Sequence, residues 1–382
     1  MELEDNLQLQ QQIARLQALL EISHQIHSTI ELDSVLRSVL QITVRELEMA
    51  GAFFTVFPFS YGEIPPRFLL SPPSSDPGRG CFRFPLLDRH GAALTDMIVI
   101  TRNYAPLTLY EQDFLENLAI QAAVAIENAR YHERTLDMER VKQDLASARD
   151  IQRSLLPQAI PDIPGYNIAM RSVTCYEVGG DYLDVLSLPS GELMVVVADV
   201  AGKGLASALV GSSFRSAFRA IAFSGLSLVD MAMHLNGLHF GEGDASRRRY
   251  VTAMFLRLDP EAHTLEAVNA GHNPGFLLNG SKDPILIEAT GTPIGMLPVS
   301  SYSSEKHVLD EKSKLLVYTD GLTEVFRGEE EFGSERLLQS FRACNHSGAK
   351  DILESLWQTL DAFSSQSSQS DDMSAIVVGR EL

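Results

Sequence analysis

The chain has 382 residues, which is enough for two or three domains that each bury a hydrophobic core. Hydrophobic residues make up 45% of it and charged residues 21%, so neither a disordered nor a fibrous protein fits. The formal net charge of -19 repels nucleic-acid phosphates and anionic lipid surfaces, which argues against nucleic acid as a partner.

Cysteine usage and hydropathy indicate the compartment. The three cysteines are far apart and lack the paired spacing of a zinc site or a disulfide framework, so we expect reduced, mostly buried thiols. The first residues lack the features of a signal peptide, and no run of about 18 apolar residues could span a bilayer. We therefore expect a cytoplasmic protein without a membrane partner.

Residues 1–130 are predicted to form a first α+β domain. Apolar residues spaced by three and four predict a helix up to about residue 30 and a second over Leu32 to Leu47. Strands are expected at residues 52–59, 82–87 and 96–101, with a Pro-, Ser- and Gly-rich loop at 65–80. Thr108 and Glu111 have the spacing of a capping box, which predicts that a long helix begins there.

Residues 131–157 are predicted to continue this helix as a linker. Six positions follow a heptad pattern of three- and four-residue steps: Met138, Val141, Leu145, Ala148, Gln152 and Leu155. This pattern predicts a coiled coil that pairs two chains into a homodimer. The alternative is a helix that packs on its own domain.

Residues 158–382 alternate short strands with two helical regions. Strands are expected at 166–173, 192–199, 250–258, 264–270, 274–278, 313–319 and 373–378. Helices are expected at 206–238, interrupted near Gly225, and at 335–363, interrupted near Gly348. This order of elements predicts a layered α+β domain.

Aspartates recur at the ends of these strands. Asp199 and Asp320 each follow an apolar run, Asp371 and Asp372 precede another, and Asp181 follows paired glycines. Carboxylate oxygens are the ligands that Mg²⁺ and Mn²⁺ prefer, and two such ions can share a water and aim it at a phosphorus. Histidine and cysteine do not cluster with these aspartates, which disfavours zinc. The pattern predicts a phosphomonoesterase site.

The sequence also resembles a known family over residues from about 145 to the C-terminus. The residues that carry the resemblance, in order, are 148–157 (ARDIQRSLLP), 178–184 (VGGDYLD), 199–204 (DVAGKG), 269–274 (NAGHNP), 291–295 (GTPIG), 318–324 (YTDGLTE) and 371–374 (DDMS). These motifs resemble the SpoIIE and RsbU branch of the metal-dependent PPM serine/threonine phosphatases.

The resemblance implies an α/β/β/α sandwich that holds two Mn²⁺ or Mg²⁺ ions between its central sheets. Asp199 would bridge both ions, and the carbonyl of Val200 would add a ligand. Asp320 and Asp371 would complete one metal site, and Asp181 would hold the other ion. The resemblance also extends to Asp184 and Asp372, which are expected to orient a loop or a metal-bound water.

Three further features have a structural interpretation and a functional one. His272 could act as a general acid, but Gly271 to Pro274 has the composition of a tight turn. Lys203 lies between glycines, yet the spacing of a P-loop is missing. The run of arginines at 247–249 is expected to be a solvated face, with docking of an acidic phosphoprotein as the alternative.

Residues 115–129 resemble the closing helix of GAF sensory domains, which bind small ligands or mediate dimerisation. The leading hypothesis is therefore a signal-regulated phosphatase. Its substrate would be phosphoserine or phosphothreonine on a regulatory protein, such as an anti-anti-sigma factor. One alternative is a catalytically silent sensory scaffold that binds a partner. Another is a nucleotide cyclase, suggested by Gly179, Gly180 and Asp181 alone.

Overall fold

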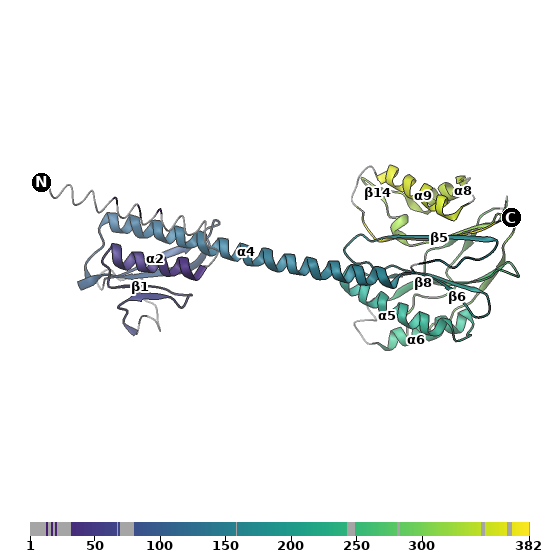
Figure 1. Cartoon of the computed structure of the whole chain (residues 1–382), viewed down its shortest axis with the longest axis horizontal. Coiled ribbons are helices and arrows are strands. Elements are labelled where there is room, and N and C mark those ends of the chain that lie inside the picture. The colour runs from purple at the N-terminus through teal and green to yellow at the C-terminus, as the bar shows by residue number, and fades with distance from the viewer. Residues whose placement is uncertain are drawn as a thin grey trace. The chain divides into compact units, whose positions relative to one another are not determined.

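The computed structural model describes residues 13, 17, 20, 32–66, 68, 80–157, 159–242, 249–280, 283–344, 348–364 and 369–381. The chain divides into two compact units, Met1–Val141 and Lys142–Leu382 (Figure 1). Within the described residues, no helix is both long and apolar enough to cross a membrane. All three cysteines are free thiols, and two of them are buried.

The first unit is built on a four-stranded antiparallel sheet with the order β2-β1-β4-β3. Its strands are β1 (Gly51–Phe54), β2 (Ser60–Gly62), β3 (Cys81–Leu87) and β4 (Ala93–Ile100). Helix α2 (Leu32–Glu46) and the first half of α4 (Leu109–Leu155) share one apolar core with the sheet. A smaller cluster around Phe53 and Ile98 covers the other face.

The predicted helix over Leu32 to Leu47 and the predicted strands near 82–87 and 96–101 are confirmed. The single strand predicted at 52–59 is wrong. The strand ends at Phe54, whose amide donates to the Phe59 carbonyl across a reversal at residues 55–58, and β2 then pairs back on β1. The helix predicted up to residue 30 and most of the loop at 65–80 lie outside the described residues.

Helix α4 begins at the predicted capping box. The Thr108 amide donates to Glu111 Oε2 at 2.8 Å, and the Glu111 amide donates to Thr108 Oγ1 at 3.3 Å. These reciprocal bonds satisfy two amides that a helix start otherwise leaves unpaired. The helix runs for 47 residues and ends at Leu155, two residues before Pro157. Both the start and the end agree with the sequence prediction.

The second unit contains two five-stranded antiparallel sheets. One has the order β11-β10-β13-β16-β5 and the other β12-β9-β8-β7-β6. Their strands are β5 (Tyr166–Val173), β6 (Tyr182–Ser187), β7 (Leu193–Val200), β8 (Val251–Asp259), β9 (Thr264–Ala270), β10 (Gly275–Leu278), β11 (Ile285–Ile287), β12 (Glu305–Val308), β13 (Lys314–Tyr318) and β16 (Met373–Arg380). A short hairpin joins β14 (Phe326–Arg327) to β15 (Glu330–Glu331).

Three apolar cores define the layers of this unit. One core lies between the two sheets. A second packs α5 (Leu205–Ala222) and α6 (Leu228–Gly241) on the β6–β9 sheet, and a third packs α8 (Gly333–Ala343) and α9 (Ala349–Ser364) on the other sheet. The helix pairs therefore flank the sheets on opposite sides (Figure 1), which gives the α/β/β/α order that the family resemblance implies. Both predicted helix interruptions, near Gly225 and Gly348, are confirmed.

Candidate metal centre

Strand register brings Asp181 and Asp199 together on one sheet. Strand β6 pairs antiparallel with β7 and places Tyr182 opposite Ala198. Asp181, directly before β6, therefore lies across from Asp199 near the end of β7. The charge of Asp199 acts directly on Asp181, so the two carboxyl groups lie close together. Paired strand ends, rather than a loop, position these two predicted residues.

The same principle places Asp320 near Asp371 and Asp372 on the other sheet. Strands β13 and β16 pair antiparallel with Tyr318 opposite Ala375, so the residues after β13 meet those before β16. Thr319 fixes this junction, because its amide donates to the Ser374 carbonyl at 2.9 Å. Asp320 then begins a 3-10 turn that spans Asp320–Leu322.

Thr319 also connects the two sheets. Its hydroxyl group donates to Asp181 Oδ2 at 2.8 Å, across 138 positions of sequence. Thr319 is fully buried and Asp181 is partly buried, so the access of water to this bond is limited. The four predicted ligands Asp181, Asp199, Asp320 and Asp371 thus lie at the adjoining ends of two packed sheets.

The charges of these carboxyl groups interact strongly. Burial, followed by the charges of Asp320 and Asp371, raises the pKa of Asp199 to about 7. Burial and the charge of Asp199 raise the pKa of Asp181 well above its ordinary value, and burial with the charge of Asp371 raises that of Asp320. Carboxylates that repel one another in a partly buried place are stabilised by a cation.

Lys203 supplies one such cation. Its ammonium group lies 2.7 Å from Asp371 Oδ2 and donates to the Ser370 carbonyl at 2.7 Å. The sequence alone indicates no role for Lys203, because the spacing of a P-loop is missing. Its position three residues beyond the end of β7, facing the segment before β16, could not be predicted without the sheet pairing.

The donor set fits a hard divalent cation, because all four predicted side chains offer carboxylate oxygens. The carbonyl of Val200 adds a neutral donor nearby, and a Cβ on Gly180 would lie only 3.1 Å from it. Within the described ranges, no three His, Cys, Asp or Glu side chains converge closely enough to coordinate a metal ion. Two of the four carboxylates interact with protein groups instead: Asp371 pairs with Lys203, and Asp181 accepts a hydrogen bond from Thr319. Coordination through Asp371 would therefore require this carboxylate to exchange Lys203 for the ion.

Asp372 orients a loop, as the sequence analysis expected. Its Oδ1 accepts from the Cys175 amide and its Oδ2 from the Gly180 amide, both at 2.7 Å. A Cβ on Gly179 would lie 2.4 Å from Asp372 Oδ2, so only glycine allows this approach. The carboxylate of Asp372 thereby fixes the backbone that leads into Asp181.

Asp184 points away from the other aspartates. It is fully buried and accepts two hydrogen bonds from Arg219 of α5, from Nε at 2.6 Å and from Nη2 at 3.0 Å. Tyr182 donates to the same carboxylate. Residues two apart on a strand share a face, and Tyr182 belongs to the core beneath α5 and α6. Asp184 therefore anchors β6 to this helix layer.

His272 is a buried structural residue. Its amide donates to Asn269 Oδ1 at 2.7 Å, and its Nδ1 lies 2.9 Å from Thr252 Oγ1. Burial lowers the pKa of His272 to about 4, so the ring is neutral near pH 7. These contacts support the interpretation of residues 271–274 as a tight turn.

Of the arginine run at 247–249, Arg247 and Arg248 lie outside the described residues, and Arg249 is partly buried.

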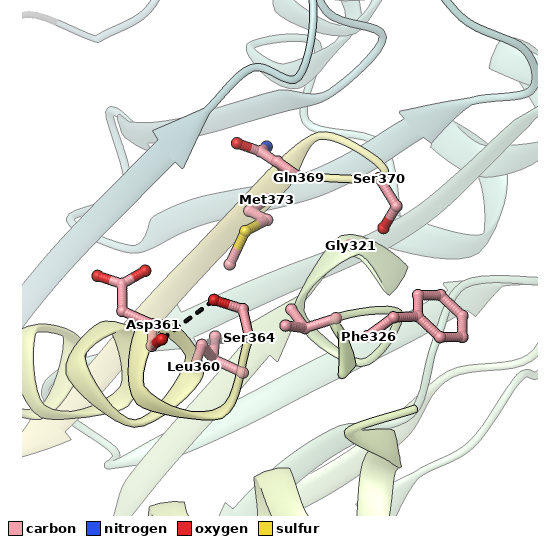
Figure 2. Close-up of a pocket in the computed structure, with 9 residues that line it drawn as sticks. Gly321, Phe326, Leu360, Asp361, Ser364, Gln369, Ser370 and Met373 are labelled. Carbon is pink, nitrogen blue, oxygen red and sulfur yellow. Dashed lines mark hydrogen bonds between the residues drawn. The ribbon is translucent and has the colours of Figure 1, made fainter. Parts of the chain in front are cut away.

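A small cavity of about 100 Å³ borders the aspartates of the β13–β16 sheet (Figure 2). Gly321, which follows Asp320, and Ser370, which precedes Asp371, both line it. Apolar side chains complete its wall, among them Leu360, Phe326 and Met373. No sequence pattern indicated this cavity, because α9 and the two aspartate segments form it only after folding.

Comparisons with known proteins identify the family of the second unit. A family model described as Stage II sporulation protein E (SpoIIE) matches residues 189–381. Phosphoserine phosphatase RsbP of Bacillus subtilis is 31% identical over 189 residues, which cover 47% of this chain and 45% of RsbP. Protein IcfG of Synechocystis sp. is 28% identical over 265 residues, which cover 62% of this chain and 41% of IcfG. The chain thus spans about half the length of these curated relatives.

Solved structures show the same fold. The structure of the RsbU and RsbW domains of Rv1364c from Mycobacterium tuberculosis is similar with a TM-score of 0.51 and 26% identity, over 59% of this chain and 63% of that chain. The SiaA-PP2C domain of Pseudomonas aeruginosa is similar with a TM-score of 0.55 and 19% identity, over 64% of this chain and 98% of that domain. Because the SiaA domain is only 19% identical, this similarity shows a shared fold alone.

Proposed function

Because the chain belongs to the SpoIIE family of PP2C-type phosphatase domains, we propose that it is a metal-dependent phosphoprotein phosphatase. It would hydrolyse phosphoserine or phosphothreonine on a regulatory protein. The observation that carries the proposal is the meeting of Asp181, Asp199, Asp320 and Asp371 at the ends of two packed sheets. Burial and the charges of neighbouring carboxylates raise the pKa values of Asp181, Asp199 and Asp320, as expected of a carboxylate cluster that a cation stabilises.

In this proposal Asp199 would contribute to the binding of both of two Mn²⁺ or Mg²⁺ ions, together with the carbonyl of Val200. Asp320 and Asp371 would hold one ion, and Asp181 would hold the other. When bound, such a pair of ions lowers the pKa of water and offsets negative charge on a phosphoryl group. The chain's own residues keep the ligands in place: Thr319 holds Asp181, and Asp372 fixes the loop before it.

A phosphorylated regulatory protein, such as an anti-anti-sigma factor, is the substrate that we propose. Its support is the similarity to the phosphoserine phosphatases RsbP and RsbU, the second of which is 25% identical over 187 residues. The cavity in Figure 2 would give a side chain next to the phosphorylated residue a partly apolar place to lie. We also propose a cytoplasmic location.

We further propose that residues 1–130 form a GAF-like sensory domain that regulates the phosphatase through α4. Within the catalytic unit, Gln152 of α4 donates to the Gly179 carbonyl at 2.7 Å and accepts from its amide at 3.2 Å. A change in α4 would therefore reach the loop before Asp181. Removal of residues 1–130 should change the rate of phosphate release, and an unchanged rate and metal dependence would argue against regulation.

The direct test of the activity is phosphate release from a phosphoserine peptide with Mn²⁺, with Mg²⁺ and with a chelator. We expect release with either ion or both and none with the chelator. Release that is equal in the chelator would contradict the metal-dependent mechanism. No release under any condition, also after removal of residues 1–130, would favour the silent scaffold.

A further inference from the structure

A second cavity lies beside the proposed metal centre, on the side of the linker helix. It is open to solvent, has a volume of about 460 Å³, and is lined by the last turns of α4 and by the segment that follows β5. Arg149 and Arg153 come from α4 and lie four residues apart, which places them on the same face of the helix. Residues 172–177 form the opposite wall.

Arg149 lacks a counter-ion in this cavity. Its side chain is partly buried, and its Nε atom is buried without a hydrogen-bond acceptor. Within the part of the chain that the structure describes, its guanidinium group makes neither an ion pair nor a hydrogen bond. A desolvated cation without a partner is unfavourable, and the unmet donors of an arginine suit a carboxylate or a phosphate. The lack of a partner is notable in a chain with a net charge of -19.

The wall of this cavity is connected to the aspartate cluster. The amide of Cys175, which lines the cavity, donates to Asp372 Oδ1 at 2.7 Å, and Asp372 directly follows Asp371. In α4, Gln152 lies between the two arginines in sequence and donates to the Gly179 carbonyl at 2.7 Å. An anion in the cavity would therefore lie against the segment that Asp372 binds through the Cys175 amide.

We propose that Arg149 and Arg153 form a docking pocket for an acidic side chain of the phosphoprotein substrate, close in sequence to the phosphorylated residue. The proposal rests on the phosphatase function proposed above and adds a substrate preference to it. An exposed carboxylate, Glu177, also lines the cavity and would repel a doubly charged phosphate more than a singly charged carboxylate. The open shape of the pocket suits a side chain carried by an extended polypeptide.

The test uses two labelled phosphoserine peptides that differ only in their flanking residues, Asp and Glu in one and Asn and Gln in the other. Binding to the full chain is measured by fluorescence anisotropy at low and at physiological salt. We expect wild-type protein to bind the acidic peptide about tenfold more tightly at low salt, and salt to reduce this preference.

Four variants make the assignment specific. Arg149→Gln and Arg153→Gln should each reduce the preference to less than about threefold, and Arg149→Lys should keep part of it because the charge remains. Arg342→Gln, which removes an exposed arginine of α8 outside the pocket, should bind both peptides as the wild type does. If Arg149→Gln fails to fold, the exposed Arg153 still tests the pocket.

Equal binding of the two peptides by the wild type would overturn the docking pocket, and so would a preference that survives in both Arg→Gln variants. Because binding is measured without turnover, these outcomes are separate from the fate of the phosphatase proposal. Phosphate release without an acidic preference would overturn the pocket alone. An acidic preference without phosphate release would support the pocket and contradict the phosphatase.

Discussion

At the scale of single residues, Lys203 connects the loop after β7 to the segment before β16. Its ammonium group forms an ion pair with Asp371, whose carboxylate is one of the proposed metal ligands. Ion and lysine would therefore compete for the same oxygen atoms. Because Lys203 is about half exposed, the ion pair contributes little to stability, and its main effect should be on metal affinity.

Replacing Lys203 by glutamine should strengthen Mn²⁺ binding about three- to tenfold, because the ion no longer has to displace an ammonium group. Isothermal titration calorimetry measures this affinity directly. Lys350→Gln, which removes an exposed lysine of α9, is the matched control and should bind Mn²⁺ as the wild type does. Weaker Mn²⁺ binding by Lys203→Gln would show that Lys203 supports the site rather than competes with the ion.

Gly179 is a residue at which a single methyl group should disturb the loop before Asp181. Its Cβ would meet both Asp372 and Thr174 at less than 3 Å, so the loop before Asp181 would have to move. Gly179→Ala should reduce phosphate release about 100-fold or more and destabilise the protein by about 1–3 kcal/mol. Gly237→Ala in the middle of α6, where a Cβ meets nothing within 4 Å, should leave release unchanged and increase stability slightly.

His272 should make the protein less stable in acid. The ring has an ordinary pKa of 6.5 and a pKa of about 4 in the fold, so the unfolded chain takes up its proton first as the pH falls. Its contribution to the free energy of unfolding is therefore complete above pH 6.5 and declines by about 3 kcal/mol as the pH passes below 4. Urea unfolding of wild type and His272→Gln between pH 7 and pH 4 measures this. An equally steep decline in the variant would contradict the assignment to His272.

At the scale of elements, strand pairing explains why aspartates so distant in sequence meet. The sequence predicts β7, β13 and β16 and the aspartates beside them, because apolar runs that end in Asp are visible without a structure. It does not predict β6, since none of the strands expected from the sequence includes residues 182–187. The distinction between Asp181 and Asp184 depends on this strand, because its alternation turns Asp184 toward α5 and Arg219.

Asp184→Asn should therefore affect stability more than chemistry. The substitution leaves the Arg219 guanidinium without its buried carboxylate, at a cost of about 2 kcal/mol, because Arg219 keeps partial access to water. Urea unfolding measures the loss, with the exposed Asp144→Asn as the control. Undiminished stability of Asp184→Asn, together with lost Mn²⁺ binding, would instead place Asp184 among the metal ligands.

At the scale of the whole molecule, α4 is the element shared by both units. Its predicted seam divides into two parts: Met138 is 73% and Val141 59% exposed, whereas the later seam positions are partly buried. Gln152 and Leu155 contact the catalytic unit, through Gly179 and through Arg215, which donates to the Leu155 carbonyl at 2.8 Å. The heptad pattern alone could not distinguish packing within the chain from pairing between chains, because both bury apolar residues at the same spacing along the helix.

Pairing of two chains through the exposed part of the seam is our prediction for the protein in solution. Sedimentation should give a mass of twice 42.1 kDa for the wild type. Val141→Glu, which brings a charge into the seam, should weaken dimerisation about tenfold or more. Gln143→Glu adds the same charge on the opposite face of α4 and should not. If the wild type is a monomer, the residues of the seam make contacts only within the chain, and the predicted pairing of two chains is wrong.

The central claim is that Asp181, Asp199, Asp320 and Asp371 form one metal centre, and Mn²⁺ titration by calorimetry tests it most directly. The account predicts two bound ions for the wild type. It predicts a loss of both for Asp199→Asn, the proposed bridging ligand, and binding close to that of the wild type for Asp184→Asn. If the wild type binds no Mn²⁺, or if Asp199→Asn binds both ions with unchanged affinity, the proposed metal centre is wrong.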